Sequence, residues 1–190
     1  VTEIAASDDG ASGDDTVVSG DGNDWIVGGA GADVITDGDG FALIFGDLGR
    51  ALALGGVMQS VTSITAARGG DDRIVTGDGE AWVIGGEGAD NITDGNGKAV
   101  LLGDLGAVTL SGGVIVRVEA TEVLTGGNDT ITTGAGDAWI VGGTGSDSIS
   151  SGQGAGFILA DTGLMTFDAL GRVTEIAASD DGASGDDTVV

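Results

Sequence analysis

Short apolar triplets alternate with glycine-rich hexapeptides along most of this chain. Ser19–Val27 reads SGDGNDWIV, and Gly28–Thr36 repeats the same nine-residue rhythm as GGAGADVIT. Glycine supplies the positive φ that tight turns need, and apolar β-branched triplets favour short strands. The pattern therefore predicts many turns of six residues, each followed by a strand of three. The middle residues of the triplets are apolar and are predicted to fill the interior: Val17, Ile26, Ile35, Ile44, Ile74, Val83, Ile92, Leu101, Ile131, Ile140, Ile149 and Ile158.

Two longer periods organise these nonapeptides. Trp25, Trp82 and Trp139 recur at equal intervals, and Val173–Val190 repeats Val1–Val18 without a change, so that one superperiod runs from Val1 to Arg172. Such periods are typical of solenoids, in which each unit buries its faces only against its neighbours. We expect a single array with units at about 10–66, 67–123 and 124–181, and with a fourth unit, identical to the first, starting at 182–190.

A different pattern follows the four nonapeptides of each unit. Leu52–Thr65, Val108–Val123 and Leu164–Ile176 alternate apolar and polar residues and are broken by GG or ALG. A turn that short joins adjacent antiparallel strands, so we favour a β-hairpin in every unit. A degenerate third coil is the alternative, because the interval between successive tryptophans also equals six nonapeptides plus three residues.

The outward residues of the triplets divide the strands into two kinds. The first and third strands of each unit carry mostly Thr, Ser, Asn or Arg, whereas the second and fourth carry large apolar residues. An exposed apolar stripe of that size is an association surface unless something covers it. We expect it to be buried, either under the hairpins or against another copy of the chain. The residues of this association face are Trp25, Phe45, Trp82, Leu102, Trp139 and Phe157.

Composition limits the chemistry. The 190 residues include 40 glycines but no proline, cysteine or histidine, and the formal net charge is -25. Zinc sites built from Cys and His, disulfides and Ser-His-Asp triads are therefore excluded. The charge argues against a nucleic-acid partner, and no apolar run is long enough to predict membrane insertion. Charge alone would predict disorder, but 41% of the residues are hydrophobic and the acids are mainly Asp, which suits turns and hard cations.

The nonapeptide resembles the RTX calcium-binding repeat G-G-x-G-x-D-x-U-x, where U is a large apolar residue. The match covers roughly two-thirds of every unit. The resemblance implies an all-β parallel β-roll, or β-solenoid, in which two turns and two strands, and hence two nonapeptides, close one coil. It also implies that several Ca²⁺ ions lie between successive coils, held by the motif Asp and by turn carbonyls. Each unit would then hold two coils plus a hairpin.

Turns on one edge of such a roll recur with every second nonapeptide, so carboxylates two nonapeptides apart are predicted to face each other on this first edge. Two facing carboxylates and several carbonyls satisfy the six to eight oxygen ligands of Ca²⁺. The alternative is that the Asp side chains only hydrogen-bond their own turns. The candidate ligands are Asp15 with Asp33, Asp72 with Asp90, Asp129 with Asp147, and Asp187, which opens the next pair.

The opposite, second edge departs from the motif. Asp24 keeps the motif position, but Ala81 and Ala138 replace it in the later units. We therefore expect weaker calcium binding on this edge, or none. The acids that could substitute as ligands in the first two units are Asp37, Asp39 and Asp94. Acids that could cap this edge, or could simply be solvated, recur after the last nonapeptide of each unit as Asp47, Asp104 and Asp161.

No catalytic constellation emerges, because the acids fall at every turn instead of gathering in one cleft, and we expect no enzyme activity. The leading interpretation is a calcium-stabilised rod of a secreted adhesin, extracellular filament or matrix protein that folds on Ca²⁺ binding outside the cell. The alternative is a calcium-binding accessory or secretion module of a secreted enzyme or toxin. The resemblance implies type I secretion from a Gram-negative cell. Expected partners are adjacent repeats or other copies, end to end or lateral.

Overall fold

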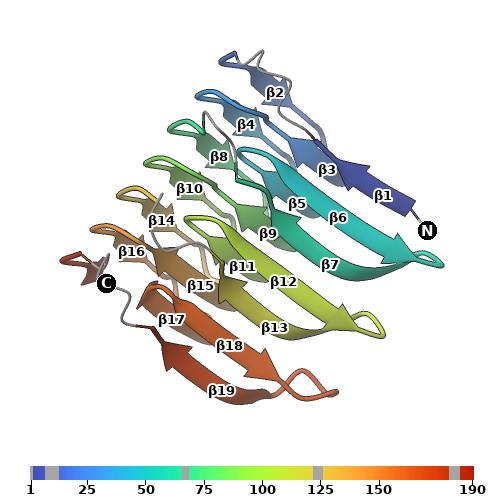
Figure 1. The fold of residues 1–190 in the computed structure, drawn as a ribbon, viewed down its shortest axis with the longest axis vertical. Helices are drawn as coiled ribbons and strands as arrows, with labels where there is room; N and C mark the ends of the chain where they lie inside the picture. Colours follow the sequence, from blue (N-terminus) through green and yellow to red (C-terminus); the bar gives the residue numbers. More distant parts are fainter. Residues whose placement is uncertain (1, 7–12, 66–68, 122–125, 180–184) are drawn as a thin grey trace.

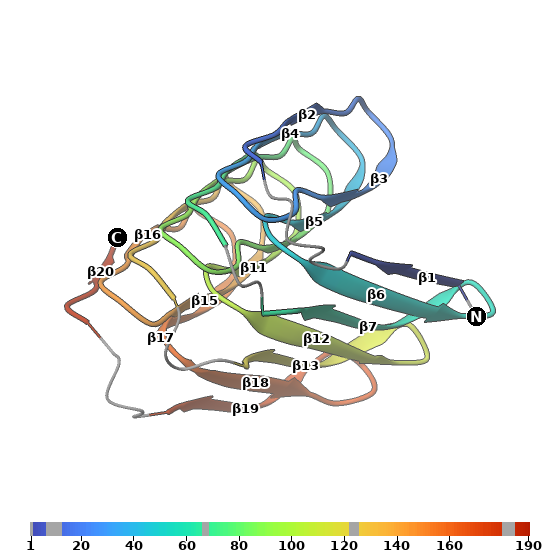
Figure 2. The same ribbon diagram turned by 45° about the horizontal axis from the view of Figure 1, so that its top comes forward.

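The computed structural model describes residues 2–6, 13–65, 69–121, 126–179 and 185–190. Small parts of the predicted first nonapeptide and second hairpin segment, at residues 10–12 and 122–123, lie outside these ranges. The described residues form twenty strands and no helix, arranged in three sheets (Figure 1, Figure 2). The predicted all-β fold with a partly parallel roll is confirmed.

Two parallel sheets form the walls of the roll. The polar sheet consists, in spatial order, of β2 (Thr16–Val18), β4 (Val34–Thr36), β8 (Arg73–Val75), β10 (Asn91–Thr93), β14 (Thr130–Thr132), β16 (Ser148–Ser150) and β20 (Thr188–Val189). The tryptophan sheet consists of β3 (Asn23–Val27), β5 (Phe41–Phe45), β9 (Ala81–Ile84), β11 (Ala99–Leu102), β15 (Ala138–Gly143) and β17 (Gly156–Asp161). Successive strands of the roll alternate between the two walls.

The parallel register stacks the middle residues of the triplets in rows. Ile35, Ile74 and Ile92 are paired across β4, β8 and β10 in the polar sheet. Val83 and Leu101 are paired in the facing tryptophan sheet. These rows meet in an apolar cluster between the two walls, where the central side chains are almost wholly buried. The residues predicted for the interior therefore form the core of the roll, with Val17 and Ile158 only partly buried in its outermost coils.

Each unit also contains a β-hairpin, and not a degenerate third coil. In the first two hairpins both residues of the two-residue turn are glycines with positive φ: +61° and +82° at Gly55–Gly56, and +61° and +85° at Gly112–Gly113. That conformation matches the right-handed twist of the flanking antiparallel strands. The hairpins pair into a third, antiparallel sheet, the hairpin sheet. It contains β1 (Thr2–Ala5), β6 (Gly49–Leu54), β7 (Val57–Ser63), β12 (Gly106–Ser111), β13 (Val114–Ala120), β18 (Gly163–Phe167) and β19 (Val173–Ala178).

The hairpins are inserted inside turns of the first edge, whose six residues we number 1 to 6. The N–H groups of Gly46 and Asp47 donate to the carbonyls of Ile84 and Gly85 in the next coil, so these two residues are positions 1 and 2, and the chain then leaves for the hairpin. It returns at Gly69–Asp72, which supplies positions 3 to 6. The first insertion therefore comprises residues 48–68. One unit is thus four nonapeptides plus one insertion, which the alternative of six degenerate nonapeptides does not describe.

The hairpin sheet lies against the outer face of the tryptophan sheet (Figure 2). Phe45, Trp82 and Leu102 are buried in a second apolar cluster with residues of the hairpins, while Trp25 and Trp139 are partly buried against it. Phe157, on the edge strand β17, remains 36% exposed. The association face inferred from the sequence is therefore covered mainly within the chain, by its own hairpins.

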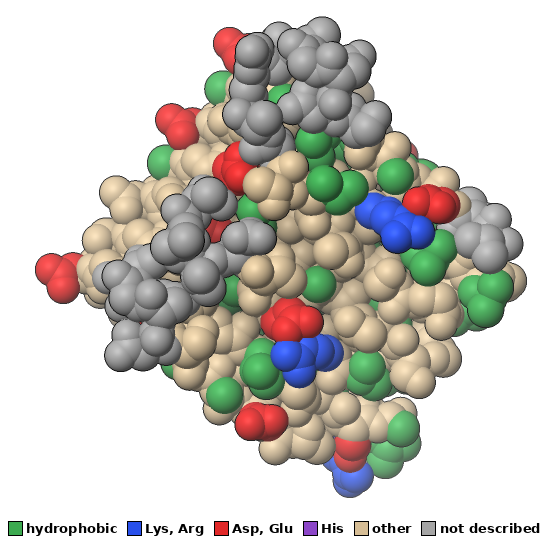
Figure 3. All heavy atoms as spheres, in the orientation of Figure 1, with side chains coloured by type: hydrophobic (Ala, Val, Ile, Leu, Met, Phe, Trp, Pro, Cys, Tyr) green, Lys and Arg blue, Asp and Glu red, His purple; other side chains and the backbone are tan. Residues whose placement is uncertain are grey.

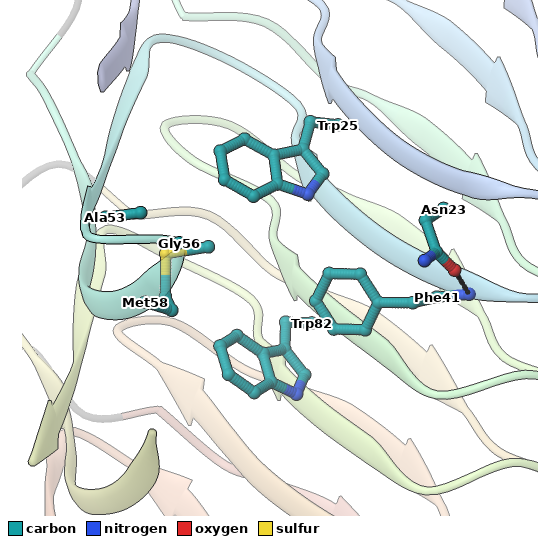
Figure 4. A pocket seen from close by; sticks show the side chains of 7 residues that line it. All are labelled: Asn23, Trp25, Phe41, Ala53, Gly56, Met58 and Trp82. Atoms are coloured by element: carbon teal, nitrogen blue, oxygen red, sulfur yellow. Dashed lines mark hydrogen bonds between the residues drawn. The ribbon is translucent and has the colours of Figure 1, made fainter. Parts of the chain in front are cut away.

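A cavity of about 390 Å³ lies between the tryptophan sheet and the first hairpin. Trp25, Phe41 and Trp82 line one side of it, and Met58 lines the other (Figure 4). The Phe41 and Trp82 rings meet edge to face with centroids 5.4 Å apart. These rings pack against each other and the hairpin, which is the role that aromatic side chains between two sheets ordinarily fill.

Replacing Trp82 by Asp is expected to lower the thermal midpoint of the calcium-loaded protein sharply. Trp82 is 8% exposed, and its indole Nε1 donates a hydrogen bond to Glu80 Oε1 at 3.0 Å. Losing a buried Trp costs about 3–5 kcal/mol, and an unpaired charge between two sheets adds to that loss. Leu54→Asp at a hairpin tip, where the side chain is 59% exposed, is the control and should change little. Unchanged melting and an unchanged oligomeric state in Trp82→Asp would contradict burial of this face.

Basic side chains on the outer face of the hairpin sheet each lie beside an acid (Figure 3). Arg50 pairs with Glu3 at 2.6 Å, Arg117 with Glu119 at 2.5 Å, and Arg172 with Asp168 at 2.7 Å. These pairs are exposed or half-buried, so each contributes little stability. They also leave no basic patch among the described residues of this face that would attract a polyanion.

Candidate metal centre

A ladder of aspartates runs the length of the first edge. At each step, the backbone N–H of one Asp at position 6 donates to Oδ1 of the next Asp along the stack. The predicted pairs lie 18 residues apart, but the ladder also continues across each insertion, where the spacing is 39 or 40 residues. The donor–acceptor distances are 2.7 Å for Asp15 to Asp33 and for Asp33 to Asp72, and 2.8 Å for Asp72 to Asp90, Asp90 to Asp129, Asp129 to Asp147 and Asp147 to Asp187.

The second carboxylate oxygen of the interior ladder residues has no hydrogen-bond partner and no contact with solvent. These orphaned Oδ2 atoms belong to Asp33, Asp72, Asp90, Asp129 and Asp147. A buried carboxylate oxygen without a donor costs several kcal/mol unless a proton or a cation joins it. The first edge therefore presents one unsatisfied oxygen per turn to a ligand of positive charge.

The glycine at position 1 of each turn leaves room for these oxygens. A Cβ at Gly85 would collide with Asp90 Oδ2 and with the carbonyl oxygen of Gly103 in the next coil. The same two kinds of oxygen would block a Cβ at Gly28, Gly46, Gly103 and Gly142. A carboxylate oxygen and a backbone carbonyl thus converge on each of these five first-edge turns, which is the donor set that hard cations prefer.

Comparison with known proteins identifies the repeat. The family model of the RTX calcium-binding nonapeptide repeat (4 copies) matches residues 9–42 and 124–158. The chain carries RTX calcium-binding nonapeptide repeats. No curated protein and no solved structure matches the chain.

RTX nonapeptides bind Ca²⁺ at multiple sites, and the first edge fits that ion. The ladder Oδ2 atoms and the carbonyls beside them would hold it, and bound Ca²⁺ would supply the positive charge that these oxygens lack. No group of three or more acidic side chains gathers around one point in the part of the chain that the structure describes. Backbone carbonyls must therefore complete each RTX site. In the same residues, no helix is long and apolar enough to cross a membrane.

The electrostatics of the RTX ladder favour binding of a cation or a proton. Burial is the main cause that raises the pKa of Asp90 to about 10, with added repulsion from Asp129 and Asp72. Burial likewise raises the pKa of Asp72 and of Asp129 to about 8, and that of Asp147 to about 7. Each carboxylate is thus destabilised in its ionised form by its surroundings, and a divalent cation relieves both causes at once.

Each hairpin divides a first-edge turn into two parts. The acids at position 2 of the first two divided turns, Asp47 and Asp104, link these parts by hydrogen bonds, and we call them staples. Asp104 Oδ1 accepts from the N–H of Gly127 at 3.0 Å, and its Oδ2 accepts from the N–H of Thr144 at 2.5 Å and from Thr144 Oγ1 at 2.9 Å. Asp47 makes the equivalent bonds to the N–H groups of Gly70 and Glu87. Burial raises the pKa of Asp47 to about 7 and that of Asp104 to about 6.

The prediction that these acids cap the second edge, or are solvated there, is therefore wrong for Asp47 and Asp104. Both are buried on the first edge, because the hairpin leaves the roll after position 2 of a first-edge turn. Their carboxylates join the two halves of the split turn, and they tie it to the next coil. The sequence signal was present, since Gly46–Asp47 and Gly69–Asp72 together read GDGGDD, which matches the hexapeptide G-G-x-G-x-D except for Asp47 at position 2.

The four acids that were predicted as ligands on the second edge lie in different surroundings. Asp37 is buried, Asp24 is half-buried and Asp39 is exposed. Burial is the main cause that raises the pKa of Asp37; the hydrogen bond from Ser19 lowers it, and the nearby charge of Asp24 raises it. Asp39 Oδ1 accepts from the N–H of Asp78 at 2.8 Å, so it acts as a turn acid in the stack. Asp94 is buried like Asp37.

Proposed function

We propose that this chain is a segment of a calcium-stabilised structural rod, such as an adhesin, an extracellular filament or a matrix protein, with no catalytic role. The observation that supports this proposal is the continuity of the sheets across units. β7 pairs with β12, and β13 pairs with β18, so the hairpin sheet continues without interruption alongside the roll. A stack that adds identical coils gains length without changing its cross-section, which suits a spacer or fibre.

The segments of identical sequence support continuation of the rod in the same geometry. β1 and β19 share one sequence, and they pair with β6 and with β18 in the hairpin sheet. β2 and β20 likewise share one sequence and lie at opposite ends of the polar sheet. One strand can therefore end one superperiod and begin the next. β19 contains the sequence that, as β1, pairs with β6. A second copy or an adjacent repeat is therefore the expected partner of the free edge of β19.

Export and folding are coupled in this proposal. RTX repeats are typical of secreted proteins, and the formal charge of -25 opposes compaction while the carboxylates are ionised and calcium is scarce. Outside the cell, the free energy of calcium binding becomes free energy of folding, because the unfolded chain has no assembled sites. Type I secretion from a Gram-negative cell is the route that we propose.

Small-angle X-ray scattering in Ca²⁺ tests the rod when one superperiod is compared with two superperiods in tandem. We expect the maximum dimension to rise about twofold while the cross-sectional radius stays constant, because each added coil only extends the stack. Light scattering that grows with protein concentration would indicate end-to-end pairing of copies. A two-period chain that folds back into a compact particle would contradict the proposal.

A further inference from the structure

The second edge carries its carboxylates at a different position of the turn from the first edge. First-edge turns have Asp at position 6 and, apart from Ala160, Gly at position 1, where a Cβ would collide with that Asp, as at Gly85 and Asp90. Second-edge turns have Ala or Gly at position 6 in every case but Asp24, which leaves space at position 1. The residues that occupy position 1 there are, in order, Ser19, Asp37, Thr76, Asp94, Thr133 and Ser151.

Asp94 and Asp37 each have one satisfied and one orphaned oxygen. Asp94 Oδ1 accepts from Thr76 Oγ1 at 2.7 Å, and Asp37 Oδ1 accepts from Ser19 Oγ. Oδ2 of both residues has no hydrogen-bond partner and is shielded from solvent, and both residues are only 4% exposed. This is the arrangement of the ladder aspartates on the first edge, produced by different residues.

The neighbours of these two carboxylates are oxygen donors. β10 lies between β8 and β14 with Thr93 aligned to Val75 and Thr132, so Thr76 and Thr133 flank Asp94 in the stack. Both threonines are buried. Asp37 has the carboxylate of Asp24 close by, and no acid occupies the equivalent place near Asp94, where Ala81 stands.

We infer that Asp37 and Asp94 each hold a calcium ion on the second edge, in sites whose carboxylate comes from position 1 of the turn. Hydroxyl, carboxylate and backbone oxygens are the ligands that Ca²⁺ takes. The first unit, with two carboxylates, binds more tightly than the second, which has one. The third unit has Thr133 and Ser151 at these positions and holds none. This inference adds to the first-edge sites and does not depend on the proposed rod.

The third unit supplies the test, because it shows which residues the stack accepts without an acid. The double variant Asp37→Ser with Asp94→Thr replaces both buried acids by hydroxyl side chains, so that position 1 carries only Ser or Thr in the first two units, as it does in the third. Equilibrium dialysis with Ca²⁺ should show two fewer ions per chain for the double variant and one fewer for Asp94→Thr alone. Asp78→Asn, which changes an exposed turn acid on the same edge, should leave the number unchanged.

Two further variants make every outcome decisive. Asp37→Asn with Asp94→Asn keeps the side-chain shape and should also lose two ions, which covers the case in which the Ser and Thr variant fails to fold. Asp90→Asn should lose calcium from the first edge independently. If either folded double variant keeps the full number of ions while Asp90→Asn loses calcium, the second-edge sites do not exist and the first-edge sites stand.

Discussion

In EDTA at pH 8 the protein is expected to lose most of its β-sheet signal in far-ultraviolet circular dichroism. Five ladder carboxylates on the first edge each bury an oxygen without a partner. Leaving such a group unsatisfied costs about 1–3 kcal/mol, and more when it is charged, whereas domains of this size are stable by only about 5–15 kcal/mol. The total cost of these five unpaired oxygens is therefore large enough to unfold the chain. Added Ca²⁺ should restore the signal.

Magnesium is the control for this experiment, because Mg²⁺ demands a tight octahedral shell and releases its waters reluctantly. It should restore little of the signal at concentrations where Ca²⁺ restores all of it. Asp90→Asn should raise the calcium concentration needed for half-refolding, and Asp78→Asn should not. A chain that keeps its β-sheet signal in EDTA at pH 8 would refute calcium-dependent folding.

Without calcium, acid is expected to stabilise the fold. Burial, as the main cause, raises the pKa of Asp72, Asp90 and Asp129 from 3.8 to about 8, 10 and 8. Between these values and pH 4 the folded chain binds protons that the unfolded chain has released. The stabilisation is thus fully present below pH 4, falls steadily as the pH rises above that, and is gone once the pH has passed the folded-state pKa values of about 8 to 10.

Urea unfolding in EDTA at pH 5 and at pH 6.5, below the pH at which the calcium-free chain is expected to unfold, measures this effect. The unfolding midpoint should be clearly higher at pH 5, since each unit of pKa difference is worth about 1.4 kcal/mol and several groups contribute. With Ca²⁺ present the trend should reverse, because protons compete with the cation for the same oxygens. Higher calcium-free stability at pH 6.5 than at pH 5 would show that the ladder carboxylates are not buried as described.

The sequence alone was sufficient for the roll and for the stacking of first-edge aspartates two nonapeptides apart. The nine-residue period marks Ile35, Ile74 and Ile92 as equivalent interior positions, and the coil of two nonapeptides that the RTX resemblance implies brings Asp72 beside Asp90. The contact between Asp33 and Asp72 was not predicted. Spacing arguments assume uninterrupted nonapeptides, and the hairpin lengthens this step to 39 residues.

The cover of the tryptophan sheet and the staple were harder to predict for a different reason. Periodicity shows that Trp82 lies on an outward face, but it does not show whether a hairpin or another chain packs there. For Asp104 the deciding facts are the positions of the N–H groups of Gly127 and Thr144, which depend on where the chain leaves and re-enters the turn. The exchange of acid and small residue between positions 1 and 6 on the second edge depends on a contact that periodicity does not give, because it is the closeness of Gly85 to Asp90 that excludes a side chain at position 1.

The split turn has a consequence for how such a protein can vary. Asp47 and Asp104 hold the two cut ends of a turn in place whatever the intervening chain does. Residues between positions 2 and 3 can consequently change in number without shifting the coils on either side. The step from Asp147 to Asp187, at 40 residues in place of 39, already shows one such change absorbed with the same 2.8 Å bond. Each staple thus marks a site at which a segment of new sequence can be inserted into the chain while the coils on either side stay in register.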